Sequence, residues 1–319
     1  MIHLSSGRRA FLRASLAGAA CAVVPFGSAI AQPAKLTLDD VNRMSVEAFV
    51  AAFGDVIEFT PAAAKSAYDK RPFATVTALH EALFDGLRLL PPAGHHAFFK
   101  RLSDIGENAV PFTAASTSEQ AKAGVSSLGT ADLARLHELN KAYRARFDMS
   151  YTICVRRNTV QQIFDEFERR LKGDKQDVEL ANAIREEHLI TRLRIGEQVS
   201  GPGAPKIYGD LTAHVLNAMV GKPAGGVSVA LYEVFGEQVR KVSESLTNAD
   251  GRADLLKGQP VPIGRYEMRF GLGDYFRKNT TPAVEPFFDV VPVRLFLDKP
   301  EESWHVPMIA TPFNYSTHA

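Results

Sequence analysis

The hydrophobic positions between Thr37 and about Ser200 follow a helical spacing. Apolar residues recur at intervals of three and four, and the segment from Leu180 to Val199 has the pattern of one long helix. Long alternation of apolar and polar residues, which is typical of strands, is absent from this half. The pattern therefore predicts an all-helical bundle. Its clearest repeats are Val46, Phe49, Val50 and Phe53; Leu133, Leu136, Leu139 and Tyr143; and Phe164, Phe167 and Leu171.

A Pro/Gly-rich segment at 201–205 interrupts this pattern and is typical of a linker. Beyond it, apolar residues alternate with small or polar ones, and turn signals at 248–251 and 271–274 separate the runs. We therefore predict a multidomain α and β chain, with a helical domain at 36–200 and a β-sandwich at 206–319. The predicted strand runs are Val227, Val229 and Leu231; Tyr266, Met268 and Phe270; and Phe288, Val290, Val291, Val293 and Leu295.

The N-terminal segment has the features of an export signal. Arg8 and Arg9 precede an apolar run from Ala14 to Ile30, and residues 29–31 have the small-x-small pattern of a cleavage site. The paired arginines resemble a twin-arginine signal, a type that exports folded proteins. A Sec signal or a membrane anchor is the alternative, but the run is short and interrupted. We expect residues 1–31 to be removed from a periplasmic protein.

Composition limits the classes of partner. The chain has 319 residues, 45% hydrophobic and 23% charged, which suits two soluble globular domains. Without the three arginines of the predicted signal, 34 basic residues face 36 acidic ones. This balance gives no electrostatic footprint for nucleic acid or an anionic membrane, so we expect small polar substrates. Cys154 is the only cysteine after cleavage, so no internal disulfide is expected.

Three polar residues of the β half can form a hydrolytic site. His214 lies in an apolar strand, Arg252 follows a tight turn, and His305 lies in a strand that we expect Pro307 to end. An uncharged imidazole can take a proton from water, and a guanidinium can hold an oxygen on which charge develops. This set could hydrolyse a cyclic amide without a metal. The alternative is that each histidine is a hydrogen-bonded structural residue.

Three segments of this half lie at 211–224, 247–252 and 304–317. They resemble the motifs of transthyretin-like 5-hydroxyisourate hydrolases and occur in the same order. They read Leu-Thr-Ala-His-Val-Leu-Asn-Ala-Met-Val-Gly-Lys-Pro-Ala, Thr-Asn-Ala-Asp-Gly-Arg and Trp-His-Val-Pro-Met-Ile-Ala-Thr-Pro-Phe-Asn-Tyr-Ser-Thr. The resemblance implies a transthyretin-like sandwich, a homotetramer with active sites between dimers, and no cofactor. It also implies that the catalytic residues are His214, Arg252 and His305.

The end of the chain departs from this family. The hydrolases usually finish Tyr-Ser-Thr-Tyr-Arg-Gly-Ser, whereas this sequence has Tyr-Ser-Thr-His-Ala at 315–319. The arginine and serine that line the family's site are missing, and His318 is a candidate to fill part of their space. Transthyretins, the hormone carriers of the same fold, lack this ending and the catalytic histidines. Because the histidines are present here, a hydrolase is favoured over a carrier.

The helical half, from about Leu36 to Gln198, resembles 2-oxo-4-hydroxy-4-carboxy-5-ureidoimidazoline (OHCU) decarboxylase. The resemblance implies that Ser116, Glu119 and Arg194 bind substrate. The two halves together resemble a fusion of the bifunctional allantoin synthase type. The matching segments are Phe53-Gly-Asp-Val-Ile-Glu58 with Pro61, Arg71-Pro-Phe-Ala-Thr-Val-Thr-Ala-Leu-His80, Ser116-Thr-Ser-Glu119-Gln120 with Ala123-Gly124, and Leu193-Arg194.

The helical half lacks the family's central histidine. Leu102 and Ser103 stand where the family has a His-Pro pair at a helix end, and the family's Phe-Gly-Phe-Pro-Phe stretch is altered at 147–151. Leucine cannot donate a proton, so we expect decarboxylation to be impaired or lost. The alternative is an intact enzyme that uses His95 or His96, which lie in a predicted Pro-Pro-Ala-Gly loop.

Other residues of the helical half have structural alternatives. Ser116 and Glu119 have the spacing of a helix capping box, and Arg194 could lie on a solvated helix face. His80 and His188, on helices with an apolar pattern, are expected to be structural.

The combined prediction is an enzyme of urate catabolism. The C-terminal domain would hydrolyse 5-hydroxyisourate to OHCU, and the helical domain would bind OHCU and decarboxylate it to (S)-allantoin poorly if at all. The alternative is a catalytically decayed periplasmic binding protein for purine-derived ligands. A zinc site shared by His214 and His305 is a third reading, but the sequence has no close His/Cys/Asp ligand spacing, so no metal is expected.

Overall fold

The computed structural model describes residues 35–107, 113–259 and 261–318. The predicted export signal at 1–31 lies outside the described residues. Among the helices in these ranges, none combines the length and the apolar character needed to cross a membrane.

The half before residue 200 is helical, as the hydrophobic spacing predicts. Two short strands, β1 (Leu36–Thr37) and β2 (Val199–Ser200), pair in parallel and join the beginning of this half to its end. The helices are α1 (Leu38–Arg43), α2 (Val46–Phe53), α3 (Pro61–Tyr68), α4 (Val76–Arg88), α5 (Pro92–Lys100), α6 (Ala114–Lys122), α7 (Thr130–Phe147), α8 (Val160–Gly173) and α9 (Gln176–Gln198).

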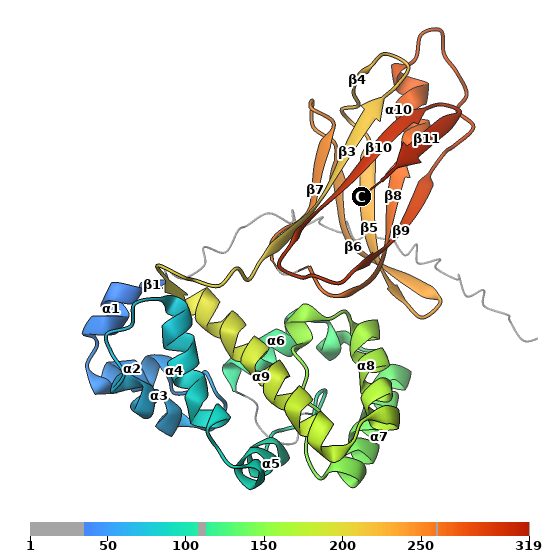
Figure 1. Ribbon diagram of the computed structural model, residues 1–319. Helices are drawn as coiled ribbons and strands as arrows, with labels where there is room; N and C mark the ends of the chain where they lie inside the picture. The colour runs from blue at the N-terminus through green and yellow to red at the C-terminus, as the bar shows by residue number, and fades with distance from the viewer. Residues whose placement is uncertain (1–34, 108–112, 260, 319) are drawn as a thin grey trace, which may run out of the picture. The chain divides into compact units, whose positions relative to one another are not determined.

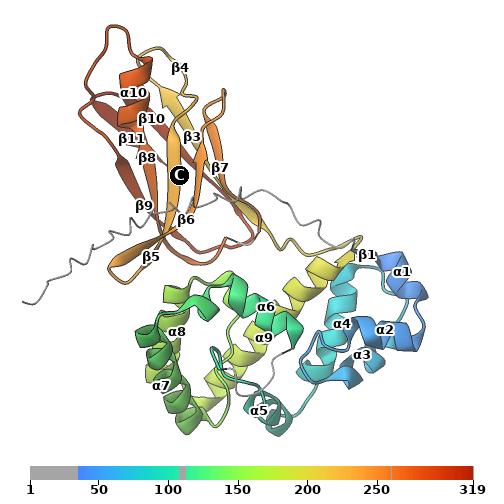
Figure 2. The ribbon, with the colours of Figure 1, turned by 180° about the vertical axis from the view of Figure 1, so that it is seen from behind.

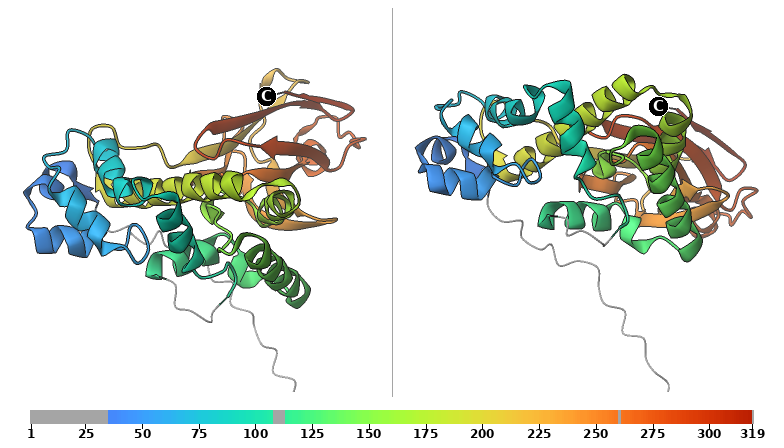
Figure 3. Two further views of the ribbon diagram at one scale, coloured as in Figure 1. Left: turned by 60° about the horizontal axis from the view of Figure 1, so that its bottom comes forward. Right: turned by 90° about the horizontal axis from the view of Figure 1, so that it is seen from below.

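The long helix α9 is the centre of the helical half. It runs between α1–α4 on one side and α6–α8 on the other (Figures 1, 2 and 3). Its Ile195 packs into one hydrophobic cluster with α1–α4, and its Ala183 packs into a second cluster with α5, α7 and α8. Because α9 is covered on both sides, it buries polar as well as apolar residues, among them Glu187 and Arg194.

The C-terminal half consists of two β-sheets around one hydrophobic core (Figure 1). One sheet has the order β11-β10-β3-β4, with β7 also paired to β3, and the other has the order β6-β5-β8-β9. β3 and β10 pair in parallel, although they stand near opposite ends of this half. The elements are β3 (Gly209–Asn217), β4 (Lys222–Pro223), β5 (Ser228–Phe235), β6 (Gln238–Leu246), β7 (Arg252–Gln259), β8 (Gly264–Gly271), α10 (Leu272–Asn279), β9 (Val291–Leu297), β10 (Ser303–Thr311) and β11 (Asn314–Thr317).

Three local predictions in the β half are wrong. Segment 271–274 begins helix α10 rather than a turn, because Leu272, Tyr275 and Phe276 have helical spacing and become buried. The strand predicted from Phe288 begins only at Val291.

Pro307 does not end its strand either. β10 continues to Thr311, and the carbonyl of Pro307 accepts a hydrogen bond of 2.7 Å from the Thr317 hydroxyl. A proline removes one backbone donor but keeps its acceptor, so it is tolerated within this strand.

Candidate functional site

The sheet that contains β3 and β10 presents polar residues on its outer face. In β3 the side chains of Leu211, Ala213 and Val215 are buried in the core, and those of Thr212 and His214 alternate with them and are half-buried. The predicted site residues of this half therefore lie on the face of the sheet that points away from its own core.

Strand register brings the three predicted residues together from distant segments. Arg252 of β7 pairs with His214 of β3, and His305 of β10 pairs with Thr212, two positions along β3. The His214 and His305 rings have centroids 6.1 Å apart. Nε2 of His214 is buried and has no hydrogen-bond partner among the residues that the structure describes.

A short hydrogen-bond chain orients His305. Its Nδ1 lies 2.9 Å from the Thr212 hydroxyl oxygen, and that hydroxyl can donate to the Trp304 carbonyl 3.3 Å away. When it does, Nδ1 of His305 carries the proton, and Nε2 is left as the acceptor. This is the tautomer that a general base requires.

The surroundings of His305 favour its neutral form. Partial desolvation lowers its pKa below the ordinary 6.5, and the nearby charges of Arg252, His214 and His318 act in the same direction. The contribution of His318 places the unusual end of the chain close to the predicted site. A histidine with a lowered pKa is uncharged at neutral pH and can accept a proton.

The turn before β7 holds Arg252 in place. The Asn248 side-chain oxygen accepts hydrogen bonds from the backbone N–H groups of Asp250 and Arg252, at 3.0 and 2.9 Å. Gly251 has a φ of 74°, and a Cβ there would lie 2.4 Å from the Val215 carbonyl oxygen. Only glycine fits this turn, which starts β7 at Arg252 opposite His214.

The helical half contains a second site around Arg194 of α9. Its guanidinium makes two hydrogen bonds with Glu119, of 3.1 and 2.8 Å, and another of 2.9 Å with the Ser116 hydroxyl. The three residues predicted to bind substrate therefore meet, and all three line one pocket. Arg194 is only 5% exposed, so its alternative placement on a solvated face is wrong.

Glu58 belongs to this site, although the sequence analysis assigned it no role. Its Oε1 accepts hydrogen bonds from the hydroxyls of Thr113 and Ser116 and lies 3.4 Å from Nη2 of Arg194. The signal was available, because Glu58 ends one of the segments that resemble the decarboxylase family. The capping-box alternative for Ser116 is wrong, because the residue that caps α6 is Thr113.

Unpartnered polar atoms converge on the same pocket. Ser103 Oγ, Thr152 Oγ1 and Glu187 Oε1 are buried without a hydrogen-bond partner in the described part of the chain, and all three residues line the pocket. Buried polar groups are normally paired, so such a group of unpaired atoms indicates a place for a polar ligand. Leu102 also lines the pocket, as an apolar wall.

Glu187 is the titratable group that the sequence analysis missed. It is 3% exposed, and burial raises its pKa from 4.5 to about 7, with the carboxylates of Glu58 and Glu119 acting in the same direction against the attraction of Arg194. A carboxyl group with this pKa can hold and release a proton near neutral pH.

His95 and His96 do not reach the pocket. Both lie in helix α5 rather than in a loop, with Pro92 at its start. Nε2 of His95 lies 2.8 Å from the Leu87 carbonyl oxygen, and Nε2 of His96 lies 3.2 Å from that of Phe147. Neither histidine is among the residues that line the pocket, so neither replaces the missing one.

Comparisons with known proteins match the two halves separately. The family model described as OHCU decarboxylase matches residues 42–196, and the one described as HIUase/Transthyretin family matches residues 211–319. A 5-hydroxyisourate hydrolase of Caulobacter vibrioides is 39% identical over 109 residues, which are 34% of this chain and 95% of that protein. A 2-oxo-4-hydroxy-4-carboxy-5-ureidoimidazoline decarboxylase of Xenopus laevis is 32% identical over 163 residues, 50% of this chain and 93% of that protein. A solved (S)-allantoin synthase matches 89% of this chain and 99% of its own, with 23% identity and a TM-score of 0.46.

The raised pKa of Glu187 predicts a pH-dependent stability difference. Its folded-state pKa of about 7 lies above the ordinary 4.5, so the folded state loses stability as Glu187 ionises between these pH values. The glutamine of Glu187→Gln never ionises. The free energy of unfolding of the variant, minus that of the unchanged protein, should therefore rise by about 3 kcal/mol between pH 4.5 and 8. Urea unfolding at several pH values measures this. The exposed control Glu138→Gln should show no such gain, and parallel curves for all three proteins would contradict the prediction.

Proposed function

This chain belongs to the OHCU decarboxylase family through its helical half and to the HIUase/transthyretin family through its β half, and we propose that it catalyses two consecutive steps of urate breakdown. The β half hydrolyses 5-hydroxyisourate to OHCU, and the helical half decarboxylates OHCU to (S)-allantoin. The observation that carries the proposal is that both sites contain buried polar atoms without a hydrogen-bond partner among the described residues. One site has such an atom at His214, and the other has them at Ser103, Thr152 and Glu187.

For the hydrolysis, His305 acts as the base. Its Nε2 takes a proton from a water molecule, whose oxygen then forms a bond to the ring carbonyl carbon of 5-hydroxyisourate. Arg252 stabilises the negative charge on the carbonyl oxygen, and His214 binds the substrate through its unpartnered Nε2. When the ring C–N bond breaks, the proton held by His305 passes to the nitrogen. Thr212 keeps His305 in the required tautomer throughout.

For the decarboxylation, Glu187 supplies the proton that the absent histidine cannot. Ser116, Glu119 and Arg194 hold the polar groups of OHCU against the pocket wall. As the bond to the carboxyl group breaks, CO₂ leaves and its electron pair forms a double bond to the neighbouring ring carbon, which carries the ureido group, while the electrons of the ring C=N bond move to nitrogen, which takes a proton from solvent. The protonated carboxyl of Glu187 then donates its proton to the ureido-bearing carbon from one side, which fixes the configuration. The hydroxyl on the other carbon loses its proton to become the ring carbonyl, and Glu187 regains a proton from solvent. A decayed binding protein is not favoured, because both sites keep titratable groups suited to proton transfer.

We propose that the protein is exported to the periplasm and assembles through the outer face of the β3–β10 sheet. The paired Arg8 and Arg9 support export. Assembly is supported by Ile309 of β10, which is 38% exposed and lies on the same face of its strand as His305. Facing copies of this sheet would enclose a site that is open in one chain, and a homotetramer is the assembly expected from the family resemblance.

The assignment of the base predicts a large loss of hydrolysis in one variant. His305→Ala should slow the decay of freshly made 5-hydroxyisourate by about 10²-fold or more, because the variant lacks the imidazole that takes the proton from water. The decay is followed by ultraviolet absorbance. Since the pKa of His305 lies below 6.5, the rate of the unchanged enzyme should fall to half its maximum only at a pH below 6.5. Equal rates for the two proteins would remove His305 from the mechanism.

The optical activity of the product tests the second step. The unchanged protein should convert OHCU to (S)-allantoin, seen as a circular dichroism signal, and Glu187→Gln should leave the slow formation of racemic allantoin. Glu138→Gln, an exposed glutamate of α7, is the matched control and should behave as the unchanged protein. If the unchanged protein gives racemate, the helical half is no decarboxylase. If Glu187→Gln keeps the full signal, the proton comes from elsewhere.

Assembly and export can be measured on the same preparation. Light scattering on a sizing column should give a tetramer, and Ile309→Glu should lower the mass because it places a charge in the proposed interface. Phe296→Glu, at a 52% exposed apolar residue of β9 on the other sheet, is the control and should leave the mass unchanged.

The N-terminus of protein recovered from the periplasm should be Gln32. A monomeric unchanged protein, or one with an intact N-terminus, would contradict the corresponding half of this proposal.

A further inference from the structure

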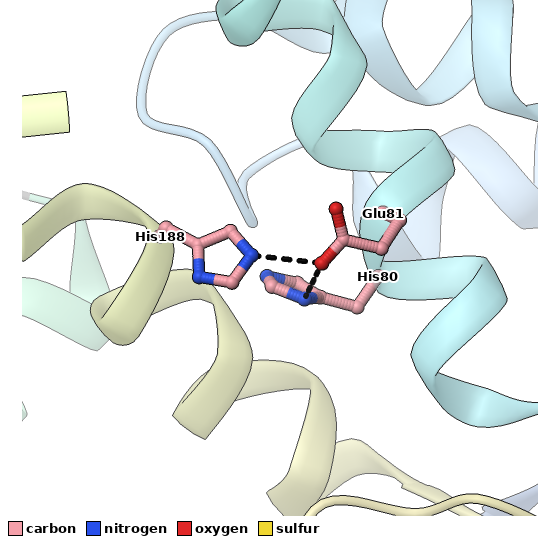
Figure 4. A group of neighbouring side chains, drawn as sticks. All are labelled: His80, Glu81 and His188. Carbon is pink, nitrogen blue, oxygen red and sulfur yellow. Dashed lines mark hydrogen bonds and ion pairs between the residues drawn. The ribbon is translucent and has the colours of Figure 1, made fainter. Parts of the chain in front are cut away.

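Two histidines and a glutamate meet between α4 and α9, apart from both proposed active sites. His80 and Glu81 come from α4 and His188 from α9 (Figure 4). Each offers one ligand atom, and the three atoms lie within 4.8 Å of one another. Oε1 of Glu81 is common to both contacts, at 2.8 Å from Nε2 of His188 and 3.6 Å from Nδ1 of His80.

The hydrogen bonds around Thr191 decide which nitrogen of His80 carries the proton. The Thr191 hydroxyl donates to a backbone carbonyl of its own helix, that of Glu187 at 3.0 Å or that of His188 at 3.1 Å. Its oxygen is then an acceptor for Nε2 of His80, 2.9 Å away. Nε2 therefore carries the hydrogen, and Nδ1 points a lone pair towards the carboxylate of Glu81.

Nδ1 of His80, whose ring is 2% exposed, and Oε1 of Glu81 are then two acceptors that face each other, and a cation between them would satisfy both. A metal ion between Nδ1 of His80, Nε2 of His188 and Oε1 of Glu81 would satisfy all three atoms.

We propose that His80, Glu81 and His188 form a binding site for a divalent transition metal ion, with Zn²⁺ as the best fit, which links α4 to α9. Two imidazoles and one carboxylate suit Zn²⁺ and exclude Ca²⁺ and Mg²⁺, which prefer oxygen ligands. Around a tetrahedral zinc, ligand atoms lie about 3.3 Å apart. The distances of 2.8 and 3.6 Å fall on either side of this value, and the three ligand atoms lie within 4.8 Å of one another, so side-chain rotations that draw the two imidazoles together complete the site.

The surrounding residues support the ligands in the way that metal sites require. Arg88 holds the other oxygen of Glu81 through a 2.5 Å ion pair, which leaves Oε1 for the metal. Thr191 fixes the ring of His80 through the nitrogen that does not face the metal. His188 and Glu81 are about one-third exposed, so water can reach the fourth position of the metal. The site is separate from the pocket that we propose for decarboxylation. Glu187, which precedes His188 in the sequence, lines that pocket, whereas His188 does not.

Zinc titration of the full chain, with any affinity tag removed, tests the site. We expect the unchanged protein to compete with a chromophoric chelator for Zn²⁺, and His188→Gln to bind at least about 10²-fold more weakly, since even the loss of an outer partner costs 10- to 100-fold. Co²⁺ should give the visible absorption of a tetrahedral ion with the unchanged protein and lose it in His188→Gln. Zn²⁺ should also raise the Tm of the unchanged protein and not that of the variant.

Three further variants keep the outcome clear. His137→Gln removes one exposed imidazole of α7 and should bind Zn²⁺ as the unchanged protein does. Glu81→Gln is a second ligand change at a partly exposed position, and it should repeat the loss if His188→Gln folds poorly. His305→Gln tests the other histidine pair. The proposal is overturned if the unchanged protein binds no Zn²⁺, if His188→Gln and Glu81→Gln bind it as tightly as His137→Gln, or if only His305→Gln loses it.

Discussion

The buried guanidinium of Arg194 is the interaction on which the helical half depends. A cation that is 5% exposed is tolerated only because Glu119, Glu58 and Ser116 surround it with hydrogen-bond acceptors. These residues come from α9, α6 and the segment between α2 and α3, so satisfying one charge fixes three parts of the chain relative to one another. The same requirement keeps a polar pocket open inside the bundle, because the charged groups cannot be replaced by packed side chains without leaving the guanidinium unpaired.

The sequence predicts this arrangement in part. The family resemblance points to Ser116, Glu119 and Arg194, and the structure places all three in one pocket. The resemblance gives no hint of Glu187, because the raised pKa of this glutamate depends on burial that only the packing around α9 produces. Helix α9 is polar around much of its circumference, and such a sequence is as typical of a solvated helix as of one covered on both sides. Leu102, which stands where the family has its histidine, lines the same pocket as Glu187, a carboxyl group whose pKa is raised to about 7.

In the β half, strand alternation predicts which side of β3 holds Thr212 and His214, and the structure agrees. Sequence patterns cannot supply the partners of a strand, so the approach of Arg252 and His305 was implied only by the family resemblance. Helix α10 was missed because Gly271, which precedes it, and Gly273 within it look like a turn, and its apolar contacts exist only once the sheet is formed. The cluster between α4 and α9 was missed for a related reason: Glu81 and His188 are 107 positions apart, far outside any local ligand motif.

The parallel pairing of β3 with β10 has a consequence for biosynthesis. Thr212 and His305 are separated by 93 positions, so β10 is synthesised well after β3 and β7, the other strands that carry the predicted site. While the intervening strands are being made, one edge of β3 has no partner, and its backbone groups are open to pairing with other chains. The helical half is complete by then and can fold first. The two histidines thus come together in a single late event, when β10 inserts beside β3, and a nascent chain that still lacks β10 has the helical pocket without the histidine pair.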